Sequence, residues 1–349
     1  MTDIFDVDDR HDQPEDVEPR PKRRRSRLVI TLLSLTAGVL AILVGAGVAF
    51  GIFAGNLAST YDAKTEKIPN AFPSGAARPE ESKNGATNIL LMGSDSRGDS
   101  TSIDSSAASD QRTDTMMLVH LDADRKAVWV MSIMRDLWVD IPGHGEHKIN
   151  AAFAYGGSAL TVETIEELLG VRIDHVAIVD FQGFEGMTDA LGGVDVVSPA
   201  DFTARGQHFT KGVNHVNGEQ ALKFVRERYS FANGDYTRVE NQQAFLRAIV
   251  EKVISKDTLT SPDKITGFVG ALSQYLSVDD TLSATEIARL GVSLRGLDKG
   301  DVHFFTIPTG GTGTSADGQS IVLQNPLDMP SLRSALADDT LDDFPPANR

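Results

Sequence analysis

The fold is decided by two neighbouring stretches, residues 87–94 (TNILLMGS) and residues 113–134 (TDTMMLVHLDADRKAVWVMSIM). The first contains a short apolar run, Ile89–Met92, closed by Gly93, which predicts a buried strand. The second contains two β-rich runs, 115–121 and 127–134, joined by polar residues, which predicts a hairpin. We therefore place the start of the globular domain at residue 87.

Strands and helices alternate after this hairpin. Asn217 with Gln220, and Ser283 with Glu286, have the spacing of capping boxes that begin helices. Ser261-Pro262 predicts another helix start, since proline is favoured in the first helical turn. The pattern predicts strands at 173–179, 194–197 and 302–307, and helices at 161–169, 181–191, 217–228, 236–255, 262 onward, 283–296 and near the C-terminus. Alternating strands and helices predict an α/β layered domain, and no second domain boundary is visible after residue 87.

The segment before the domain predicts a membrane anchor. Residues 28–55 are 28 residues without a charge, and six of the eight residues 20–27 are Lys or Arg. About 20 apolar residues cross a bilayer, and basic residues stay on the cytoplasmic side. We expect a disordered cytoplasmic leader at 1–27, a transmembrane helix at 28–55, an extracellular stalk at 56–86 and a catalytic domain at 87–340. The alternative is a cleaved signal peptide, whose apolar core would be only about 7–15 residues.

Composition excludes several classes of function. The 349 residues include 33 Lys+Arg and 49 Asp+Glu, a net charge of −16, and no cysteine. A negative chain is unsuited to non-specific nucleic-acid binding, so no nucleic acid is expected as a partner. The lack of cysteine excludes disulfides, thiolate zinc sites and cysteine nucleophiles. No G-x-S-x-G elbow or P-loop is present, so acyl transfer and nucleotide hydrolysis have no support.

Arginines stand at the ends of several expected elements, where the edge of an α/β sheet usually binds ligands. They are Arg97, Arg112, Arg135, Arg226, Arg228 and Arg238. Several planar guanidinium forks suit a pyrophosphate, although scattered surface arginines are the alternative interpretation. Asp95 and Asp114 also lie at strand edges, and two carboxylates with phosphate oxygens suit Mg²⁺ or Mn²⁺. Turn and capping roles for these aspartates remain open.

Seven ordered blocks within residues 87–255 resemble the LytR-CpsA-Psr family. They are NILLMGSDSR (88–97), RTDT (112–115), SIMRD (132–136), KINAA with YGG (148–157), F with GGVD (181–195), GEQALKFVRER (218–228) and DYTR followed by QQ (235–243). Met134 departs from the family pattern, which usually has proline there, and Asn241 stands where arginine is frequent. The polar loop 96–111 is also long.

The resemblance implies a single α/β/α sandwich domain with a central mixed sheet, preceded by one transmembrane helix in the cell membrane. It implies a phosphotransferase that moves a glycopolymer from a polyprenyl-pyrophosphate carrier to peptidoglycan. Asp95 and Asp114 would hold Mg²⁺ or Mn²⁺. The catalytic arginines would be Arg112, Arg135, Arg226, Arg228 and Arg238, with Arg97 and Gln242 as further pyrophosphate contacts. The implied partners are the polyprenyl-pyrophosphate-linked glycan, peptidoglycan and the membrane.

Alternative roles remain open for two short motifs, for Asp136 and for the whole protein. His144-Gly-Glu-His147 could bind a metal but lacks a third ligand. Arg97-Gly98-Asp99 is a weak adhesion motif. Asp136 could take the acceptor proton or could brace an arginine as an ion pair. The same chemistry could serve a protein acceptor, and a non-catalytic, membrane-tethered wall-polymer binding or regulatory protein is a further possibility, although binding alone needs no metal site.

Overall fold

The computed structural model describes residues 51–75, 78–94, 113–231 and 234–344. The chain divides into two compact units, Met1–Ala54 and Gly55–Arg349, and of the first only the helical residues 51–54 are described. In these described ranges, no helix combines the length and apolar character needed to cross a membrane. The expected leader at 1–27, and residues 28–50 of the expected membrane helix, lie outside the described residues.

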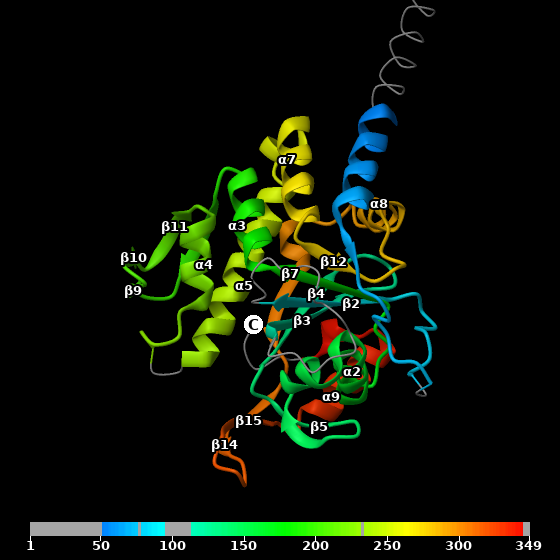
Figure 1. Ribbon diagram of the computed structural model, residues 1–349, viewed down its shortest axis with the longest axis vertical. Helices are drawn as coiled ribbons and strands as arrows, with labels where there is room; N and C mark the ends of the chain where they lie inside the picture. The colour runs from blue at the N-terminus through cyan, green and yellow to red at the C-terminus, as the bar shows by residue number, and fades with distance from the viewer. Residues whose placement is uncertain (1–50, 76–77, 95–112, 232–233, 345–349) are drawn as a thin grey trace, which may run out of the picture. The chain divides into compact units, whose positions relative to one another are not determined.

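A mixed sheet forms the centre of the second unit (Figure 1). The strand order within the described residues is β1-β12-β7-β2-β3-β4-β13. β2 pairs antiparallel with β3 and parallel with β7, and β4 pairs antiparallel with β3 and parallel with β13. The bounds are β1 Glu66–Lys67, β2 Thr87–Ser94, β3 Thr113–Leu121, β4 Val128–Ile133, β7 His175–Asp180, β12 Leu276–Val278 and β13 Val302–Thr306. The predicted hairpin and the α/β class with a central mixed sheet are confirmed.

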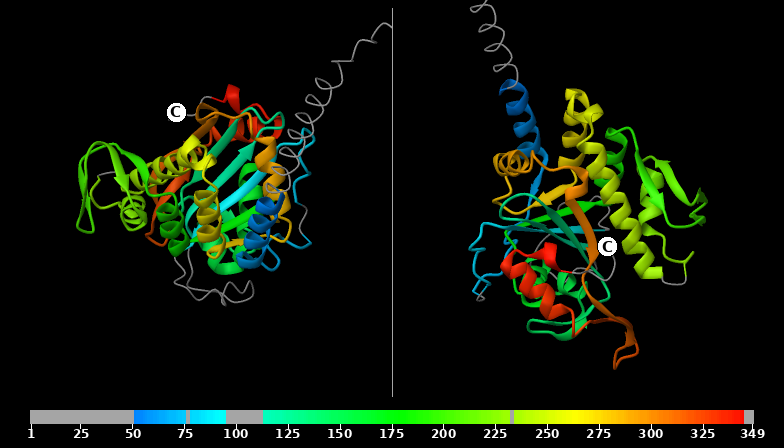
Figure 2. Two further views of the ribbon diagram at one scale, coloured as in Figure 1. Left: turned by 90° about the horizontal axis from the view of Figure 1, so that it is seen from above. Right: turned by 180° about the vertical axis from the view of Figure 1, so that it is seen from behind.

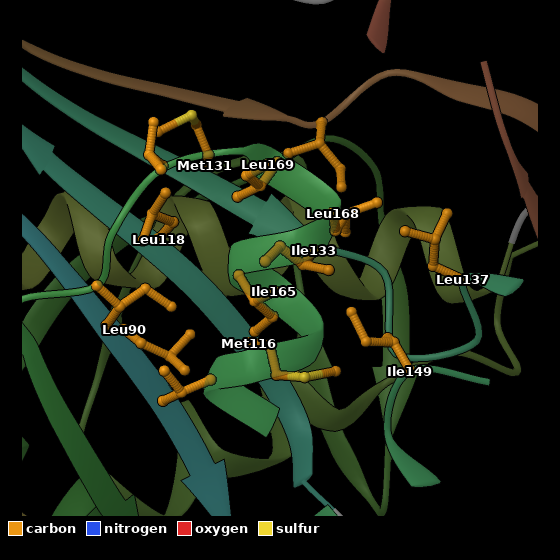
Figure 3. Close-up of a cluster of buried hydrophobic side chains, with 14 of the residues drawn as sticks. Leu90, Met116, Leu118, Met131, Ile133, Leu137, Ile149, Ile165, Leu168 and Leu169 are labelled. Carbon is orange, nitrogen blue, oxygen red and sulfur yellow. The ribbon is translucent and has the colours of Figure 1, made fainter. Parts of the chain in front are cut away.

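Alternation along the strands gives the sheet two apolar faces. Leu90 and Met92 face one core, whereas Ile89 and Leu91 pack against the other. The first face is covered by α2 (Ala151–Leu169) and α9 (Met329–Asp338). Figure 3 shows the side chains of α2 lying over those of β2, β3 and β4.

The second face is covered by α5 (Gly234–Val253), α7 (Pro262–Ser273), α8 (Ala284–Ser293) and the helical residues 55–64. The sheet therefore lies between two helical layers, as the view along it shows (Figure 2).

A separate apolar cluster lies beside the second face. It is formed by α3 (Phe181–Ala190), α4 (Gly218–Arg226), part of α5 and two small antiparallel pairs. These pairs are β8 (Val194–Ser198) with β11 (Gly212–Val216), and β9 (Phe202–Ala204) with β10 (Gln207–Phe209). Figure 1 shows this group on one side of the sheet. The remaining elements are β5 (Trp138–Ile141), β6 (Gly145–Lys148), β14 (Thr309–Thr314), β15 (Ser320–Gln324), α6 (Lys256–Leu259) and two 3₁₀ turns, Lys299–Asp301 and Leu341–Asp343.

The predicted helix starts are confirmed by their hydrogen bonds. Asn217 and Gln220 form both halves of the capping box of α4. The Ser261 side chain accepts from the Lys264 N–H, with Pro262 in the first turn of α7, and the Ser283 side chain accepts from the Glu286 N–H of α8. These bonds satisfy N–H groups that have no partner within a helix.

Several helix boundaries differ from the sequence prediction, and two of the differences have a clear local cause. α2 begins at Ala151 rather than at 161, because a kink at Gly156 and Gly157 interrupts the apolar spacing on which the prediction depended. α4 ends at Arg226 rather than near 228, because Glu227 adopts an extended backbone.

The prediction of a stalk at 56–86 is wrong, because described parts of this segment pack on the domain. Its first part is helical and Tyr61 is buried, with its hydroxyl donating to the Leu282 carbonyl at 3.0 Å. β1 then pairs with β12 at the edge of the sheet, and Ile68 and Ala71 join the core. The apolar residues of this segment are too widely spaced to show a period, yet Tyr61, Ile68 and Ala71 are all buried.

Tyr61 should therefore contribute to the stability of the domain. Tyr61→Ala should lower the free energy of unfolding by about 3 kcal/mol, because a buried ring is lost. Tyr61→Phe should cost about 1 kcal/mol, the usual value of one hydrogen bond. Denaturant unfolding measures both, with the exposed Ser59→Ala as a control expected near zero. An unchanged midpoint for Tyr61→Ala would show that this segment does not pack on the domain.

Candidate active site

The candidate site is a cavity of about 280 Å³ at one edge of the central sheet. β2, β4 and β7 end at this edge and β3 begins there, since Gly93 pairs with Thr115 and with Val179. The cavity reaches Gly93 and Thr115 and extends between the sheet and the helices α3, α4 and α5. It therefore lies where the core of the sheet meets the separate apolar cluster.

Most of the cavity wall is apolar. The second sheet face contributes Leu91, Met117 and Val179. The helices contribute Phe184 and Met187 of α3, Leu222 and Val225 of α4, and Phe245 and Leu246 of α5. Phe184 and Phe245 stack with ring centroids 4.1 Å apart, which closes the wall between α3 and α5. A wall of this kind suits a hydrocarbon chain.

Arginines and one glutamine line the same cavity. Among its described lining residues are Arg135, Arg205, Arg226, Arg228, Arg238 and Gln242, against a single carboxylate, Asp180. The chain as a whole carries a net charge of −16, so this concentration of positive charge is local. Four of the predicted arginines and Gln242 thus meet on one cavity, although the first and last are more than 100 residues apart in sequence.

The end of α4 presents Arg226, and the turn after it presents Arg228. Glu227, which is 7% exposed, accepts hydrogen bonds from the backbone N–H groups of Tyr229 at 2.7 Å and Ser230 at 2.8 Å. This turn fixes the chain just after the helix ends. The Arg228 guanidinium lies 4.7 Å from the centroid of the Tyr229 ring and donates to its hydroxyl at 2.6 Å.

The first turns of α5 present Arg238 and Gln242 on one helix face, because residues four apart in a helix are neighbours. Arg238 is buried, with 7% of its side chain exposed, and forms an ion pair with Asp235 at 3.0 Å. Asn241, the departure from the family pattern, points elsewhere: it is buried and donates to the Phe224 carbonyl at 3.2 Å. Met134, the other departure, lies in the first sheet core.

Arg135 follows β4, where Asp136 lies beside it. Asp136 is 3.6 Å from Arg135 and 3.3 Å from Lys148. These two cationic neighbours favour the bracing role for Asp136, because its carboxylate already takes part in ion pairs. The choice between bracing and general base remains a hypothesis.

Asp180 is the carboxylate in the cavity and begins α3, where its side chain accepts from the Gly183 N–H at 2.7 Å. Burial raises its pKa, and hydrogen bonds from the Gly183 and Gln182 backbone oppose the shift. The shift favours the protonated form of Asp180 relative to a fully solvated aspartate.

Arg205 was missed by the sequence analysis. It lies in the turn between β9 and β10, with a positive φ of 47°, and it reaches the cavity. The stacked rings of Phe202 and Phe209, 4.9 Å apart, pack this pair of strands against Phe224 of α4. The only sequence signal was Arg205-Gly206 between two very short apolar stretches, which are too brief to predict strands.

Several predicted residues cannot be placed. Asp95, Arg97 and Arg112 lie outside the described residues, as does the Arg97-Gly98-Asp99 motif. Asp114 lies within β3, but its side chain is not described. The predicted metal site therefore stays a prediction.

The histidines of the His144-Gly-Glu-His147 motif contact an aromatic ring. His144 stacks on Tyr155 with centroids 4.6 Å apart, and His147 meets the same ring edge-on at 5.4 Å. In the part of the chain that the structure describes, the one group of three or more possible metal-binding side chains is His120, Asp122 and Asp339.

That group lies at the opposite end of β3 from the cavity. His120 contacts Asn88 and Asp339 at 2.7 and 2.9 Å, which joins the end of α9 to the sheet. Burial and the neighbouring Asp339 and Asp342 raise the pKa of Asp122 to about 6. These contacts indicate a structural connection rather than part of the site.

The geometry suits an amphiphile with two joined phosphates. The apolar wall would take a hydrocarbon chain, and the guanidinium groups would neutralise and hydrogen-bond the phosphate oxygens. The same groups would stabilise charge that develops when a phosphate bond breaks.

Comparisons with known proteins agree with this geometry. A model described as the LytR_cpsA_psr family matches residues 52–336. The polyisoprenyl-teichoic acid–peptidoglycan teichoic acid transferase TagU of Bacillus mycoides is 33% identical over 230 residues, which is 64% of this chain and 72% of that protein. The cell wall biosynthesis protein LcpA of Corynebacterium glutamicum is 30% identical over 277 residues, covering 68% of this chain and 53% of that protein.

Solved structures share the fold. TagV of B. subtilis superposes with a TM-score of 0.61 at 28% identity, covering 76% of this chain and all of that one (100%). The structure of TagT bound to LI-WTA gives a TM-score of 0.61 at 27% identity, covering 77% of this chain and 98% of that one.

The arginines should bind pyrophosphate without being needed for folding. Arg226→Gln and Arg228→Gln should each weaken binding of inorganic pyrophosphate about tenfold, because each removes roughly 1.4 kcal/mol of charge-assisted hydrogen bonding. Their melting temperatures without anion should stay within about 2 °C of the parent protein, since like charges in an empty cavity repel. Calorimetric titration and thermal unfolding measure the two effects.

Arg289→Gln is the matched control, because it makes the same charge change on α8, where Arg289 pairs with Glu286. Equal loss of pyrophosphate binding in this control would show that only the net charge matters.

Proposed function

Because the chain belongs to the LytR-CpsA-Psr family, we propose that it transfers a glycopolymer from a polyprenyl-pyrophosphate carrier to a sugar hydroxyl of peptidoglycan, releasing polyprenyl phosphate. The observation that carries this proposal is the single cavity with an apolar wall and five described arginines. A lipid pyrophosphate has a hydrocarbon chain that suits the apolar wall and, joined to it, phosphates that suit the arginines. The named transferase activity of TagU supports the choice of substrate class.

The reaction would be a phosphoryl transfer. The acceptor hydroxyl attacks the phosphorus nearer the glycan, forming an O–P bond to the acceptor. The bond from that phosphorus to the bridging oxygen breaks, and the electron pair leaves with polyprenyl phosphate. Arg135, Arg226, Arg228 and Arg238 are suited to neutralise the charge that gathers on the phosphate oxygens. The acceptor proton goes to a base or to solvent, and Asp136 remains a candidate for that step.

A divalent cation belongs to the same proposal. Asp95 and Asp114 would hold Mg²⁺ or Mn²⁺, which would supply charge neutralisation at a phosphate oxygen. The backbone supports this assignment: Asp114 stands between Thr113 and Thr115, which pair with Ser94 and Gly93, and Asp95 follows Ser94 in the sequence. The arginine-lined cavity reaches Gly93 and Thr115, so Asp114 belongs to a strand at its edge, and Asp95 is close in sequence to Gly93.

We also propose that residues 28–55 anchor the protein in the cell membrane, with the catalytic domain outside. The run without charge at 28–55 and the basic cluster at 20–27 support this orientation. An anchored domain would meet a lipid-linked donor at the membrane surface, where the polyprenyl chain is held.

Two rival functions differ in their products. A ligase with a protein acceptor would use the same cavity and would place the glycopolymer on protein. A non-catalytic binding or regulatory protein would hold the lipid-linked polymer without releasing polyprenyl phosphate. The reaction products therefore distinguish all three.

Transfer should require both aspartates and the metal. With a purified pyrophosphate-linked donor and peptidoglycan, the parent protein should release polyprenyl phosphate, and chelator should stop the release. Asp95→Ala and Asp114→Ala should each lower turnover at least about 100-fold, because the cation would lose a ligand. Mass spectrometry of the lipid product measures release.

Asp104→Ala is the matched control, since it removes a carboxylate from the segment between Asp95 and Asp114 in sequence and should leave turnover unchanged. Full activity in chelator would remove the metal from the proposal. Binding of the donor without any release would favour the non-catalytic alternative.

Protease added to intact protoplasts should digest the domain formed by the second unit, Gly55–Arg349. The orientation places residues 56–349 outside because the basic residues 20–27 remain in the cytoplasm. Immunoblotting for a C-terminal tag follows the digestion, and a cytoplasmic protein in the same cells is the control. Protection of the domain until the protoplasts are lysed would reverse the proposed orientation.

A further inference from the structure

A second cavity, which we call the polar groove, adjoins the arginines and is not used by the proposed donor site. It has a volume of about 460 Å³, and it shares Arg135 and Arg228 with the apolar cavity. Its wall includes Asp136, Lys148, Asp235, Ser320, His147 and Tyr155. The groove thus begins where the pyrophosphate would lie and leads away from the apolar wall.

Tyr155 is the distinctive side chain of this groove. It is 40% exposed, although it is a large aromatic residue. His144 stacks on its ring with planes at 18°, and His147 meets it at 78°. His144 and His147 thus form a clamp on the Tyr155 ring. The ring centroid of Trp138, in β5, lies 6.2 Å from that of His147, so the aromatic contacts extend into β5. Tyr155 is therefore an oriented ring in a polar cavity rather than an isolated exposed residue.

The backbone after Tyr155 keeps the ring in this position. Gly156 has φ −149° and ψ 22°, and Gly157 has φ 61° and ψ −150°, a region that residues with a side chain scarcely adopt. A Cβ at Gly156 would lie 2.6 Å from the Cβ of Leu160. The kink thus depends on the two glycines, and it ends the first turns of α2 immediately beyond Tyr155.

The remaining wall presents both donors and acceptors of hydrogen bonds. Lys148 and Asp136 are paired at 3.3 Å, and the groove also includes Asp235 and the hydroxyl of Ser320. Carboxylates disfavour a further phosphate here. They suit hydroxyl and amide groups, which donate hydrogen bonds, while an aromatic ring suits the apolar face of a pyranose.

We propose that the polar groove binds a glycan taking part in the transfer, with Tyr155 as the ring on which one sugar packs. This inference rests on the proposed function, because the groove matters through its junction with the arginines. The glycan has two sources of the same chemistry: the acceptor strand of peptidoglycan, and the polymer carried by the donor. The groove gives either one a path to the phosphorus.

Direct binding tests the inference without requiring turnover. The full chain in lipid nanodiscs is mixed with soluble, undecorated peptidoglycan glycan strands, or with donor glycan freed of its lipid and pyrophosphate. Saturation-transfer NMR reports contact, and a titration gives affinity. Tyr155→Ala should weaken binding of at least one glycan about tenfold or more, whereas Tyr155→Phe, which keeps the ring, should stay within about threefold of the parent.

Controls separate this effect from misfolding and from the donor site. Tyr155→Ala should bind inorganic pyrophosphate like the parent, and His144→Ala, which removes one side of the clamp, should give a smaller loss of glycan binding. Val213→Ala, at a position 68% exposed on β11, should change nothing. The glycan whose binding depends on Tyr155 identifies the source.

Two results overturn the inference: no saturation transfer to either glycan, or equal affinities in Tyr155→Ala and the parent. The proposed function fails differently, when the parent binds a glycan through Tyr155 and yet releases no polyprenyl phosphate from the complete donor.

Discussion

Guanidinium groups repel one another, and holding several around one cavity requires a framework stiff enough to oppose that repulsion. Here the framework is the register of the sheet together with the ends of two helices. Arg135 stands two residues beyond β4, Arg226 ends α4, and Arg238 lies in the first turns of α5. Asp235 and Asp136 reduce the local charge by pairing with Arg238 and Arg135. Each of these three arginines is thus positioned by the end of a strand or helix.

The same arrangement explains why apolar and positive walls adjoin. The cavity lies along the boundary between the core of the second sheet face and the cluster built on α3, α4 and α5. Side chains on both sides of that boundary are apolar because each belongs to a core. The arginines stand at the edge of the sheet because elements end there. A binding site with two chemistries therefore follows from the layering of the domain.

Much of this could be predicted from the sequence where the signal was local. The hairpin of β3 and β4 has two β-rich runs around a polar turn, and α4 has a capping box, so both were predicted. Four arginines and Gln242 were assigned to one site from motifs and element ends, and they do line one cavity. Their chemical roles, and those of Asp95 and Asp114, remain predictions.

The rest depends on contacts between distant segments. β1 is two residues long, and it is a strand only because β12 pairs with it more than 200 residues later. Arg205 reaches the cavity because Phe202 and Phe209 on either side of its turn stack and pack against Phe224 of α4. The kink in α2 hides the first turns of the helix from any test of periodicity. None of these features has a helix or strand periodicity that is visible within one stretch of sequence.

The cavity also has a mechanical consequence. Side chains in a protein interior are normally packed as densely as molecules in organic crystals. The side chains that line this cavity of about 280 Å³ have no packing partner on one side, so they lose part of the dispersion attraction that holds the two neighbouring cores together. A chain that filled the cavity with larger side chains would gain rigidity and lose the space for a ligand.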